Sequence, residues 1–156
     1  MQDLKEFRQC LSKFATGVTV VTCANANGDC FGITANSFSS VSLEPPLVLW
    51  NIAKVSNSMQ EFLDAEYFGI NILCAQQQKE SQNFSKSVIN IFDGVEYSLG
   101  ENNIPLIDNT LAHLLCRTHD IHECGDHYII VGEVTSYASI DAEPLLFFNG
   151  AYQSLG

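Results

Sequence analysis

The sequence contains few basic residues, and this scarcity excludes several classes of partner. Its 156 residues include 7 lysines and arginines against 18 aspartates and glutamates, which gives a formal net charge of -11. Nucleic acids and anionic membrane surfaces are bound by clustered lysine and arginine side chains. We therefore expect neither a nucleic acid partner nor a membrane partner for this chain.

Long apolar runs are also missing. No run approaches the roughly 18 residues that a membrane-spanning helix needs, and the first residues lack the apolar region of a secretory signal. The 6 cysteines form no C-x-x-C pair. Without a secretion signal, free thiols in a reducing cytoplasm are expected instead of a disulfide framework.

The rest of the composition is typical of one domain over residues 1–156. Hydrophobic residues make up 46% of the chain and charged residues 16%. The low charge indicates that a partner subunit covers part of the surface. Near the start, Leu4, Phe7, Leu11 and Phe14 recur at helical spacing and predict an amphipathic helix. We expect its apolar face to pack on the domain, with a dimer contact as the alternative.

Apolar, β-branched runs separated by turn residues predict about seven strands. The turn Asn27-Gly28 is a strong hairpin signal between the first two of them. Short helices are predicted through Met59 to Leu63 and over Ala75–Lys86, and Gly94–Ile107 is predicted to be irregular. The predicted strands are Gly17–Cys23, Cys30–Asn36, Leu47–Ile52, Tyr67–Cys74, Leu111–Glu123, Tyr128–Tyr137 and Leu145–Asn149.

The order of these elements favours a mainly β fold. Strands follow one another without regular intervening helices, which argues against a parallel sheet built from strand–helix–strand units. An antiparallel β-barrel with a few short helices attached fits the pattern better.

The most informative segment is Thr34–Pro46, which reads T-A-N-S-F-S-S-V-S-L-E-P-P. It carries four serines and a threonine between two apolar runs. Such neutral donors can hold a phosphate or the polar edge of a ring cofactor without a basic cluster. On this segment alone, an ordinary loop capped by its own side chains stays open, because serine and asparagine are common in turns.

A second group of polar residues lies in H-D-I-H-E-C-G-D-H. Its histidines and cysteine suggest zinc, but His119 and His122 would point to opposite faces of a strand, so no metal is expected. His127 differs, because it follows the turn Gly125-Asp126 at a strand entrance. There it is a candidate hydrogen-bonding or proton-handling group. No G-x-S-x-G, P-loop or G-x-G-x-x-G motif supports a hydrolase or a nucleotide-binding loop.

Several blocks of sequence together resemble one family, the flavin reductase-like proteins, which are the small reductase components of two-component flavin monooxygenases. The blocks occur in family order and cover nearly the whole chain. They are F-A-T-G-V-T-V-V-T, G-I-T-A-N-S-F-S-S-V-S-L-E-P-P-L-V-L, N-I-A-K-V-S-N-S, F-G-I-N-I-L, S-Q-N-F-S, G-D-H-Y-I-I-V-G-E-V and P-L-L-F-F-N-G-A-Y.

The resemblance implies a split antiparallel β-barrel of the FMN-binding type that forms a homodimer. It implies hydride transfer from NADH or NADPH to FMN or FAD, with the reduced flavin supplied to a separate oxygenase. Such chemistry needs no protein nucleophile, because the cofactors carry it. An electron carrier reduced by a protein partner is the alternative, and a flavin-binding protein without turnover is a third possibility.

The resemblance also implies a set of cofactor contacts. Thr34–Ser37 would line the edge of the isoalloxazine ring, and the next three serines would continue that loop. Asn51, Lys54 and Ser56 correspond to contacts with the ribityl chain or phosphate. The full set of implied cofactor contacts is Thr34, Ala35, Asn36, Ser37, Ser39, Ser40, Ser42, Asn51, Lys54, Ser56, Phe84, Ser85, Lys86 and Tyr152.

Further roles and departures follow from the same resemblance. Phe84–Lys86 would lie beside the phosphate or adenine, but Ser85 and Lys86 replace the family's small apolar residue and glycine, so the choice between FMN and FAD stays open. His127 would face the nicotinamide as the catalytic-site residue, positioning the dinucleotide. Tyr152 would close the pocket. Ile91-Phe92 lacks the family's usual lysine, and without a basic cluster for a 2′-phosphate we expect NADH.

Overall fold

The computed structural model describes residues 3–88 and 90–156. Its main sheet has seven strands in the order β3-β2-β6-β9-β10-β5-β4, and all neighbours pair antiparallel. These strands are β2 (Thr19–Ala24), β3 (Cys30–Ala35), β4 (Ser39–Leu43), β5 (Pro46–Ala53), β6 (Tyr67–Ile72), β9 (Ala112–Cys124) and β10 (His127–Ser139).

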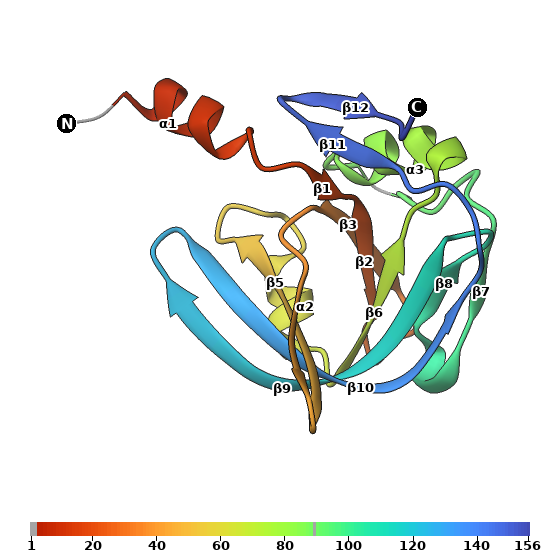
Figure 1. Cartoon of the computed structure of the whole chain (residues 1–156). Helices are drawn as coiled ribbons and strands as arrows, with labels where there is room; N and C mark the ends of the chain where they lie inside the picture. Colours follow the sequence, from red (N-terminus) through yellow and green to blue (C-terminus); the bar gives the residue numbers. More distant parts are fainter. Residues whose placement is uncertain (1–2, 89) are drawn as a thin grey trace.

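The sheet curls so strongly that its two ends approach each other (Figure 1). Strand β3 contacts β5 although the two are not neighbours in the sheet order. The barrel is therefore split between β3 on one side and the β4–β5 pair on the other. The predicted mainly β fold, a split antiparallel barrel with a few short helices, is confirmed.

Smaller elements flank the barrel. Short strands form a three-stranded sheet, β1-β11-β12, and a two-stranded sheet, β7-β8. Their bounds are β1 (Thr16–Gly17), β7 (Tyr97–Leu99), β8 (Pro105–Ile107), β11 (Leu146–Phe148) and β12 (Ala151–Gln153). The helices are α1 (Leu4–Leu11), α2 (Met59–Asp64) and α3 (Gln78–Phe84), with 3-10 turns η1 (Ala75–Gln77) and η2 (Glu101–Asn103). No helix among these described residues is long and apolar enough to cross a membrane.

Each of the predicted strands and helices is present, but two segments differ from expectation. Gly94–Ile107 is not wholly irregular, because it contains the β7–β8 hairpin. The serine-rich segment is not a simple loop, because it contains β4, which pairs with β5. Strand β4 lies at the sheet edge and is mostly exposed, so it lacks the apolar alternation that marks a half-buried strand.

Large aromatic side chains fill the barrel core. Trp50 and Phe62 meet edge to face at 5.0 Å between ring centroids, and Phe68 lies 6.2 Å from Trp50. All three are at most 1% exposed. Burying a side chain of this size stabilises the fold by about 1.5–3 kcal/mol. This cluster fixes the position of β5, on which Trp50 lies.

A buried asparagine joins three strands. Asn71 donates from Nδ2 to the Val20 carbonyl (2.9 Å) and to Thr22 Oγ1 (3.2 Å), and its Oδ1 accepts from the Ile107 amide (2.9 Å). A buried amide needs such partners, because an unpaired one would cost roughly 1–3 kcal/mol. Asn71 thereby attaches the β7–β8 hairpin to the barrel at β8.

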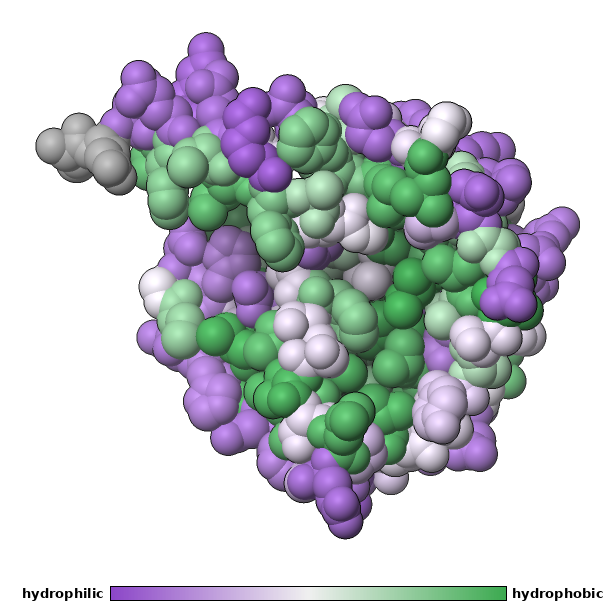
Figure 2. All heavy atoms as spheres, in the orientation of Figure 1, coloured by the Kyte–Doolittle hydropathy of each residue, from purple (hydrophilic) through white to green (hydrophobic). Residues whose placement is uncertain are grey.

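Helix α1 is present as predicted, but its apolar face does not pack on the domain. The helix has no buried residue, and Leu4, Phe7, Leu11 and Phe14 are 50–80% exposed. It extends from the body of the molecule (Figure 1) and overhangs a hollowed face rich in apolar atoms (Figure 2). The expectation that the helix packs on its own domain is therefore wrong, and the alternative of a dimer contact is retained.

Candidate functional site

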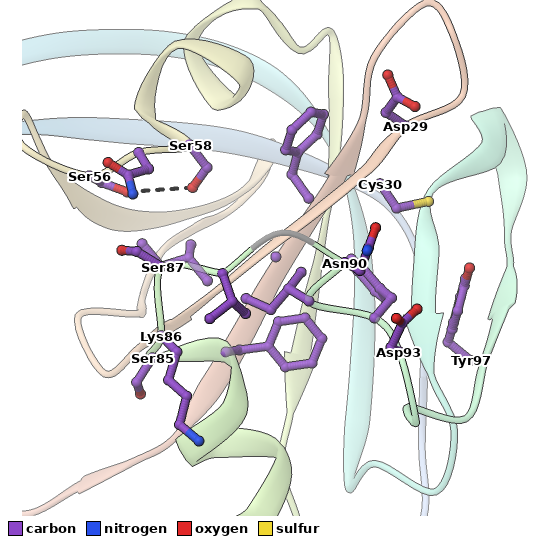
Figure 3. A pocket seen from close by; sticks show the side chains of 18 of the residues that line it. Asp29, Cys30, Ser56, Ser58, Ser85, Lys86, Ser87, Asn90, Asp93 and Tyr97 are labelled. Carbon is purple, nitrogen blue, oxygen red and sulfur yellow. Dashed lines mark hydrogen bonds between the residues drawn. The ribbon is translucent and has the colours of Figure 1, made fainter.

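A cavity of about 700 Å³ opens beside β3 (Figure 3). Its walls come from Gly28–Ile33, from the turn Ser56–Ser58 that precedes α2, and from the segment after α3. Phe84 and Phe92 pack edge to face at 5.1 Å between ring centroids and belong to the apolar part of the lining. The cavity is thus an apolar floor surrounded by short polar side chains.

A glycine on β3 makes this floor possible. A Cβ atom at Gly32 would lie 2.5 Å from Cε1 of the buried Phe84 ring. Because a real Cβ essentially never comes so close, any larger residue would displace the ring. Gly32 therefore allows the end of α3 to lie directly against the strand.

The structure brings four of the predicted contact residues together around this cavity: Ser56, Phe84, Ser85 and Lys86. Ser56 Oγ lies 3.4 Å from Ser58 Oγ, and Ser85 Oγ donates to the Ser81 carbonyl at 2.8 Å. Lys86 supplies a positive charge at the same wall. Hydroxyls and one ammonium group form a suitable site for a phosphate ester.

Two further predicted residues, Thr34 and Tyr152, are connected through α3. Thr34 Oγ1 donates to the Ser81 carbonyl at 2.6 Å, and the Ser81 hydroxyl is hydrogen-bonded to the Tyr152 hydroxyl at 2.7 Å. Ser81 is completely buried. The sequence analysis did not single out Ser81, although it begins the S-Q-N-F-S block. A small polar side chain on the same predicted helix as Phe84 was the signal that could have pointed to Ser81 as part of the site.

Another pair, Ser37 and Asn51, lies where the chain crosses from β3 to β4. Ser37 Oγ accepts from the Asn51 amide at 2.9 Å and donates to the Asn51 carbonyl at 3.3 Å. The side-chain Oδ1 of Asn51 is buried and has no hydrogen-bond partner among the described residues. Buried acceptors are nearly always paired. This oxygen can therefore accept a hydrogen bond from a ring N–H of a bound ligand.

The remaining residues of the serine-rich segment do not line the cavity. The Ala35 carbonyl accepts from Thr19 Oγ1 at 2.6 Å, and Ser39 Oγ donates to the Ser40 carbonyl at 3.0 Å. Asn36, Ser39 and Ser40 are exposed, and Ser42 is half-buried. The three serines belong to β4 at the edge of the main sheet, and the hydroxyls of Ser39 and Ser40 are on exposed residues.

His127 and Lys54 lie side by side at another end of the sheet. His127 begins β10 opposite Ala53, and the Lys54 amide donates to the Asp126 carbonyl at 2.9 Å. The Lys54 ammonium is 3.2 Å from a Glu123 carboxylate oxygen. Its charge is therefore already matched by a protein carboxylate, which reduces its capacity to offset a phosphate.

The His127 ring is oriented by its neighbour. Its Nδ1 donates to Asp126 Oδ1 at 2.8 Å, because an ionised carboxylate can only accept. This hydrogen bond and the charge of His127 lower the pKa of the Asp126 carboxyl. The arrangement leaves Nε2 as the second ring nitrogen for a ligand.

The histidines and cysteines show no arrangement for metal binding or nucleophilic attack. His122 lies 3.2 Å from Asp120, and no group of three or more metal-ligating side chains occurs within residues 3–88 and 90–156. All six cysteines are described, and all are free thiols. Burial raises the pKa of Cys116 to about 12, and burial together with Asp29 raises that of Cys30 in the cavity wall. Protonated thiols of this kind are weak nucleophiles.

Known proteins with related sequences and structures identify the family. The model of the flavin reductase like domain matches residues 11–156. The FMN reductase (NADH) SmoA of Agrobacterium fabrum is 43% identical over 151 residues, which cover 97% of this chain and 86% of that protein. The reductase component of the flavin-dependent trigonelline monooxygenase of Acinetobacter baylyi is 40% identical over 97% of this chain, which spans 49% of that relative.

A solved structure agrees with these sequence relatives. The NADH:FAD oxidoreductase SgcE6 of Streptomyces globisporus C-1027, in complex with NAD and FAD fragments, has a TM-score of 0.94 and 38% sequence identity. The match covers 99% of this chain and 93% of that one. Fold, matched residues and relatives are consistent with one another, and the chain belongs to the flavin reductase like domain family.

Proposed function

We propose that this chain is an oxidoreductase, an NAD(P)H-dependent flavin reductase that acts as one domain over residues 1–156. It transfers hydride from a nicotinamide to FMN or FAD and supplies reduced flavin to a separate oxygenase. The observation that carries the proposal is the cavity beside β3, which has an aromatic floor, a hydroxyl-rich wall and one lysine. The names of SmoA and of the trigonelline monooxygenase reductase component support it.

The residues present fit a flavin in two respects. The buried, unpartnered Oδ1 of Asn51 would accept a hydrogen bond from the isoalloxazine N–H. The hydroxyl of Ser56 and the ammonium group of Lys86 would hold the phosphate, while Ser85, whose hydroxyl donates to the Ser81 carbonyl, would line the same cavity. A bound flavin supplies the hydride-accepting ring, so the protein needs to provide position and charge and no nucleophile.

Residues of the β3–β4 crossing contribute to the same task. Thr34, Ala35, Asn36 and Ser37 would follow the edge of the ring, and Ser39, Ser40 and Ser42 would continue along it. Ser37 is held against β5 by its two hydrogen bonds to Asn51. If the β3–β4 crossing is held in place, it would keep the two reacting rings in contact. Holding reactants in the right orientation can lower the activation free energy by roughly 7–11 kcal/mol.

His127 is proposed to position the nicotinamide. Its Nδ1 is bound to Asp126, so Nε2 is directed to a ligand with its tautomer fixed. Lys54 is adjacent, and its pairing with Glu123 gives it a role in holding the hairpin more than in binding phosphate. Tyr152 acts from β12 through its hydrogen bond to Ser81.

The working form is proposed to be a homodimer. Leu4, Phe7 and Leu11 on α1, together with Phe14 just after the helix, form an apolar stripe whose side chains are 50–80% exposed in the isolated chain. Burying such side chains is favourable by about 25 cal/mol per Å² of apolar surface. The cytoplasm is the proposed compartment, since all six cysteines, each within the described residues, are free.

The test of function is the oxidation of NADH, followed by its absorbance, with purified protein and FMN, FAD or no added flavin. Turnover that depends on added flavin would support a reductase with diffusible flavin and would rank FMN against FAD. A yellow protein that leaves NADH unoxidised would contradict the proposal and favour an electron carrier reduced by a protein partner. NADPH at the same concentration tests the choice of nicotinamide.

A further inference from the structure

We propose that Ser81 of α3 is a positioning residue for flavin reduction, because it determines what three hydroxyl groups of the candidate site can offer to a ligand. These hydroxyls belong to Thr34, Ser85 and Tyr152, and each is hydrogen-bonded to Ser81. Ser81 is completely buried, so it cannot touch a ligand and acts through these neighbours. The inference rests on the proposed function and gives a task to a residue for which the family resemblance implied no contact.

Ser81 lies where three elements of the fold meet. It belongs to α3, while Thr34 belongs to β3 and Tyr152 to β12. The Tyr152 ring is also held by Phe147, which it meets edge to face at 5.4 Å between ring centroids. Ser81 therefore connects α3 to β3 through its carbonyl and to β12 through its hydroxyl.

The carbonyl of Ser81 takes up the hydroxyl protons of two residues. The Oγ1 atom of Thr34 donates to it at 2.6 Å and the Oγ atom of Ser85 at 2.8 Å, which are the usual distances for well-formed O–H···O bonds. A hydroxyl group has a single proton to donate, and its lone pairs can only accept. Towards a ligand, Thr34 and Ser85 are therefore acceptors. They suit the N–H or O–H groups of a flavin and not its phosphate oxygens.

The hydroxyl of Ser81 has the opposite effect on Tyr152. Within residues 3–88 and 90–156 its one hydrogen-bond partner is the Tyr152 hydroxyl, at 2.7 Å, and the distance alone allows either oxygen to donate. A buried donor is nearly always paired, and Ser81 is completely buried whereas Tyr152 is half-buried. We therefore assign the Ser81 proton to this bond. The Tyr152 proton then stays available for an acceptor atom of the ligand.

This arrangement separates Ser85 from its neighbour Lys86 in function. Both residues line the cavity where α3 ends (Figure 3). The Lys86 ammonium group can donate to a phosphate, but the Ser85 hydroxyl has already given its proton to Ser81. Lys86 should therefore distinguish FMN from riboflavin, which lacks the phosphate, and Ser85 should not.

The first experiment tests the acceptor role, with riboflavin and FMN as probes of the full chain in fluorescence titrations. Ser85→Ala is expected to weaken both ligands by the same factor, about threefold to tenfold for one lost hydrogen bond. Lys86→Met is expected to weaken FMN and to leave riboflavin unchanged. A loss of the preference for FMN in Ser85→Ala would overturn the assignment, because the hydroxyl would then donate to the phosphate.

The second experiment tests whether Ser81 acts through Tyr152. Tyr152→Phe removes the hydroxyl and keeps the ring that packs on Phe147, and Ser81→Ala removes the partner of that hydroxyl. Each is expected to weaken FMN by about threefold to tenfold, and the double variant no further, because residues that share one interaction are not additive. The flavin KM should rise while kcat at saturating flavin and NADH is kept. A loss of stability alone would not produce this pattern.

A matched control and a second variant keep the test decisive. Gln82→Ala changes the exposed neighbour of Ser81 on the same helix and should bind both flavins as wild type does. If Ser81→Ala does not fold, Tyr152→Phe still tests the proposal, and unchanged FMN binding in that variant would overturn it. Additive effects of the two changes would overturn it as well.

Failure of the proposed function gives a different result, namely absence of flavin-dependent NADH oxidation. The dissociation constants of riboflavin and FMN are measured without NADH. The expected responses of Ser85→Ala and Tyr152→Phe would therefore still support the positioning role of Ser81 for a flavin that is bound and not reduced.

Discussion

The hydroxyl of Ser37 makes two hydrogen bonds to the backbone of Asn51, accepting from its amide at 2.9 Å and donating to its carbonyl at 3.3 Å. The pair connects the β3–β4 crossing to β5 across the split of the barrel. The side chain thus occupies backbone groups that a neighbouring strand would otherwise pair.

Replacing Ser37 with alanine should lower the free energy of unfolding by about 1–2 kcal/mol, because the Asn51 amide would lose its partner in a half-buried position. Urea denaturation measures the change. Ser39→Ala is the matched control, since Ser39 is exposed and its hydroxyl donates to the adjacent Ser40 carbonyl. Equal stability of the two variants would contradict a structural role for Ser37.

The double variant Ser39→Ala, Ser40→Ala tests flavin binding by the serine-rich segment. Both side chains are exposed, so the fold should keep its stability. Loss of two hydroxyls that bond the flavin should weaken its binding by about 1–3 kcal/mol. Flavin fluorescence titration gives the dissociation constant, and an unchanged constant would remove these serines from the site.

His127→Ala should raise the NADH KM more than it changes the flavin dissociation constant. The reason is that His127 is proposed to contact the nicotinamide, while the flavin phosphate contacts lie at the cavity beside β3. Steady-state kinetics at saturating flavin gives the first quantity and fluorescence titration the second. His119→Ala, which changes another exposed histidine of the same hairpin, controls for general effects. Equal changes in both quantities would contradict this placement.

The pKa of Asp126 provides a pH-dependent test of the same pair. The hydrogen bond from His127, followed by the charge of His127, lowers this pKa below its ordinary value. A lowered carboxyl pKa means that the interaction is present above the unfolded-state pKa and is lost as the pH falls through the folded-state pKa. His127→Ala should therefore raise the pKa of Asp126, as followed by carboxyl carbon NMR. Lys54→Met should have a smaller effect, and the reverse order would be inconsistent with the structure.

The double variant Phe7→Glu, Leu11→Glu should dissociate the proposed dimer. Both side chains lie on the exposed apolar stripe of α1, and two carboxylates in an apolar interface would lack partners. Sedimentation equilibrium measures the mass of wild type and variant. Gln9→Glu adds charge to the same exposed helix without removing an apolar side chain and should leave the mass unchanged. A monomeric wild type would disprove the dimer.

Much of the fold could be predicted from the sequence because its strands are apolar and its turns are explicit. The run through Val20 and Val21 is buried as expected, and the turn at Gly28 adopts the positive φ of 82° that its glycine permits. Strand β4 could not be predicted in the same way, since its serines satisfy an edge ladder without apolar side chains. The packing of α1 was predicted wrongly because periodicity identifies an apolar face but not the surface that covers it.

The candidate site was predicted in part, since family motifs name residues but not their connections. The family resemblance implied that Thr34 and Tyr152 contact the cofactor separately. The structure joins them through Ser81, a residue distant in sequence from both. Likewise, Tyr97 belongs to a segment predicted to be irregular, so its place in the cavity wall follows from the β7–β8 pairing and not from any local pattern.

The hydrogen bond between Ser81 and Tyr152 makes the last strand a natural reporter of events near β3. The hydroxyl of Tyr152 is hydrogen-bonded to the hydroxyl of Ser81 on α3. The carbonyl of Ser81 in turn accepts a hydrogen bond from Thr34 Oγ1. A fluorinated tyrosine at position 152 would place a magnetic resonance label that is connected to Thr34 through a single intervening residue, Ser81. Occupancy beside β3 would then become visible as a change in fluorine chemical shift, without a coloured ligand and without turnover.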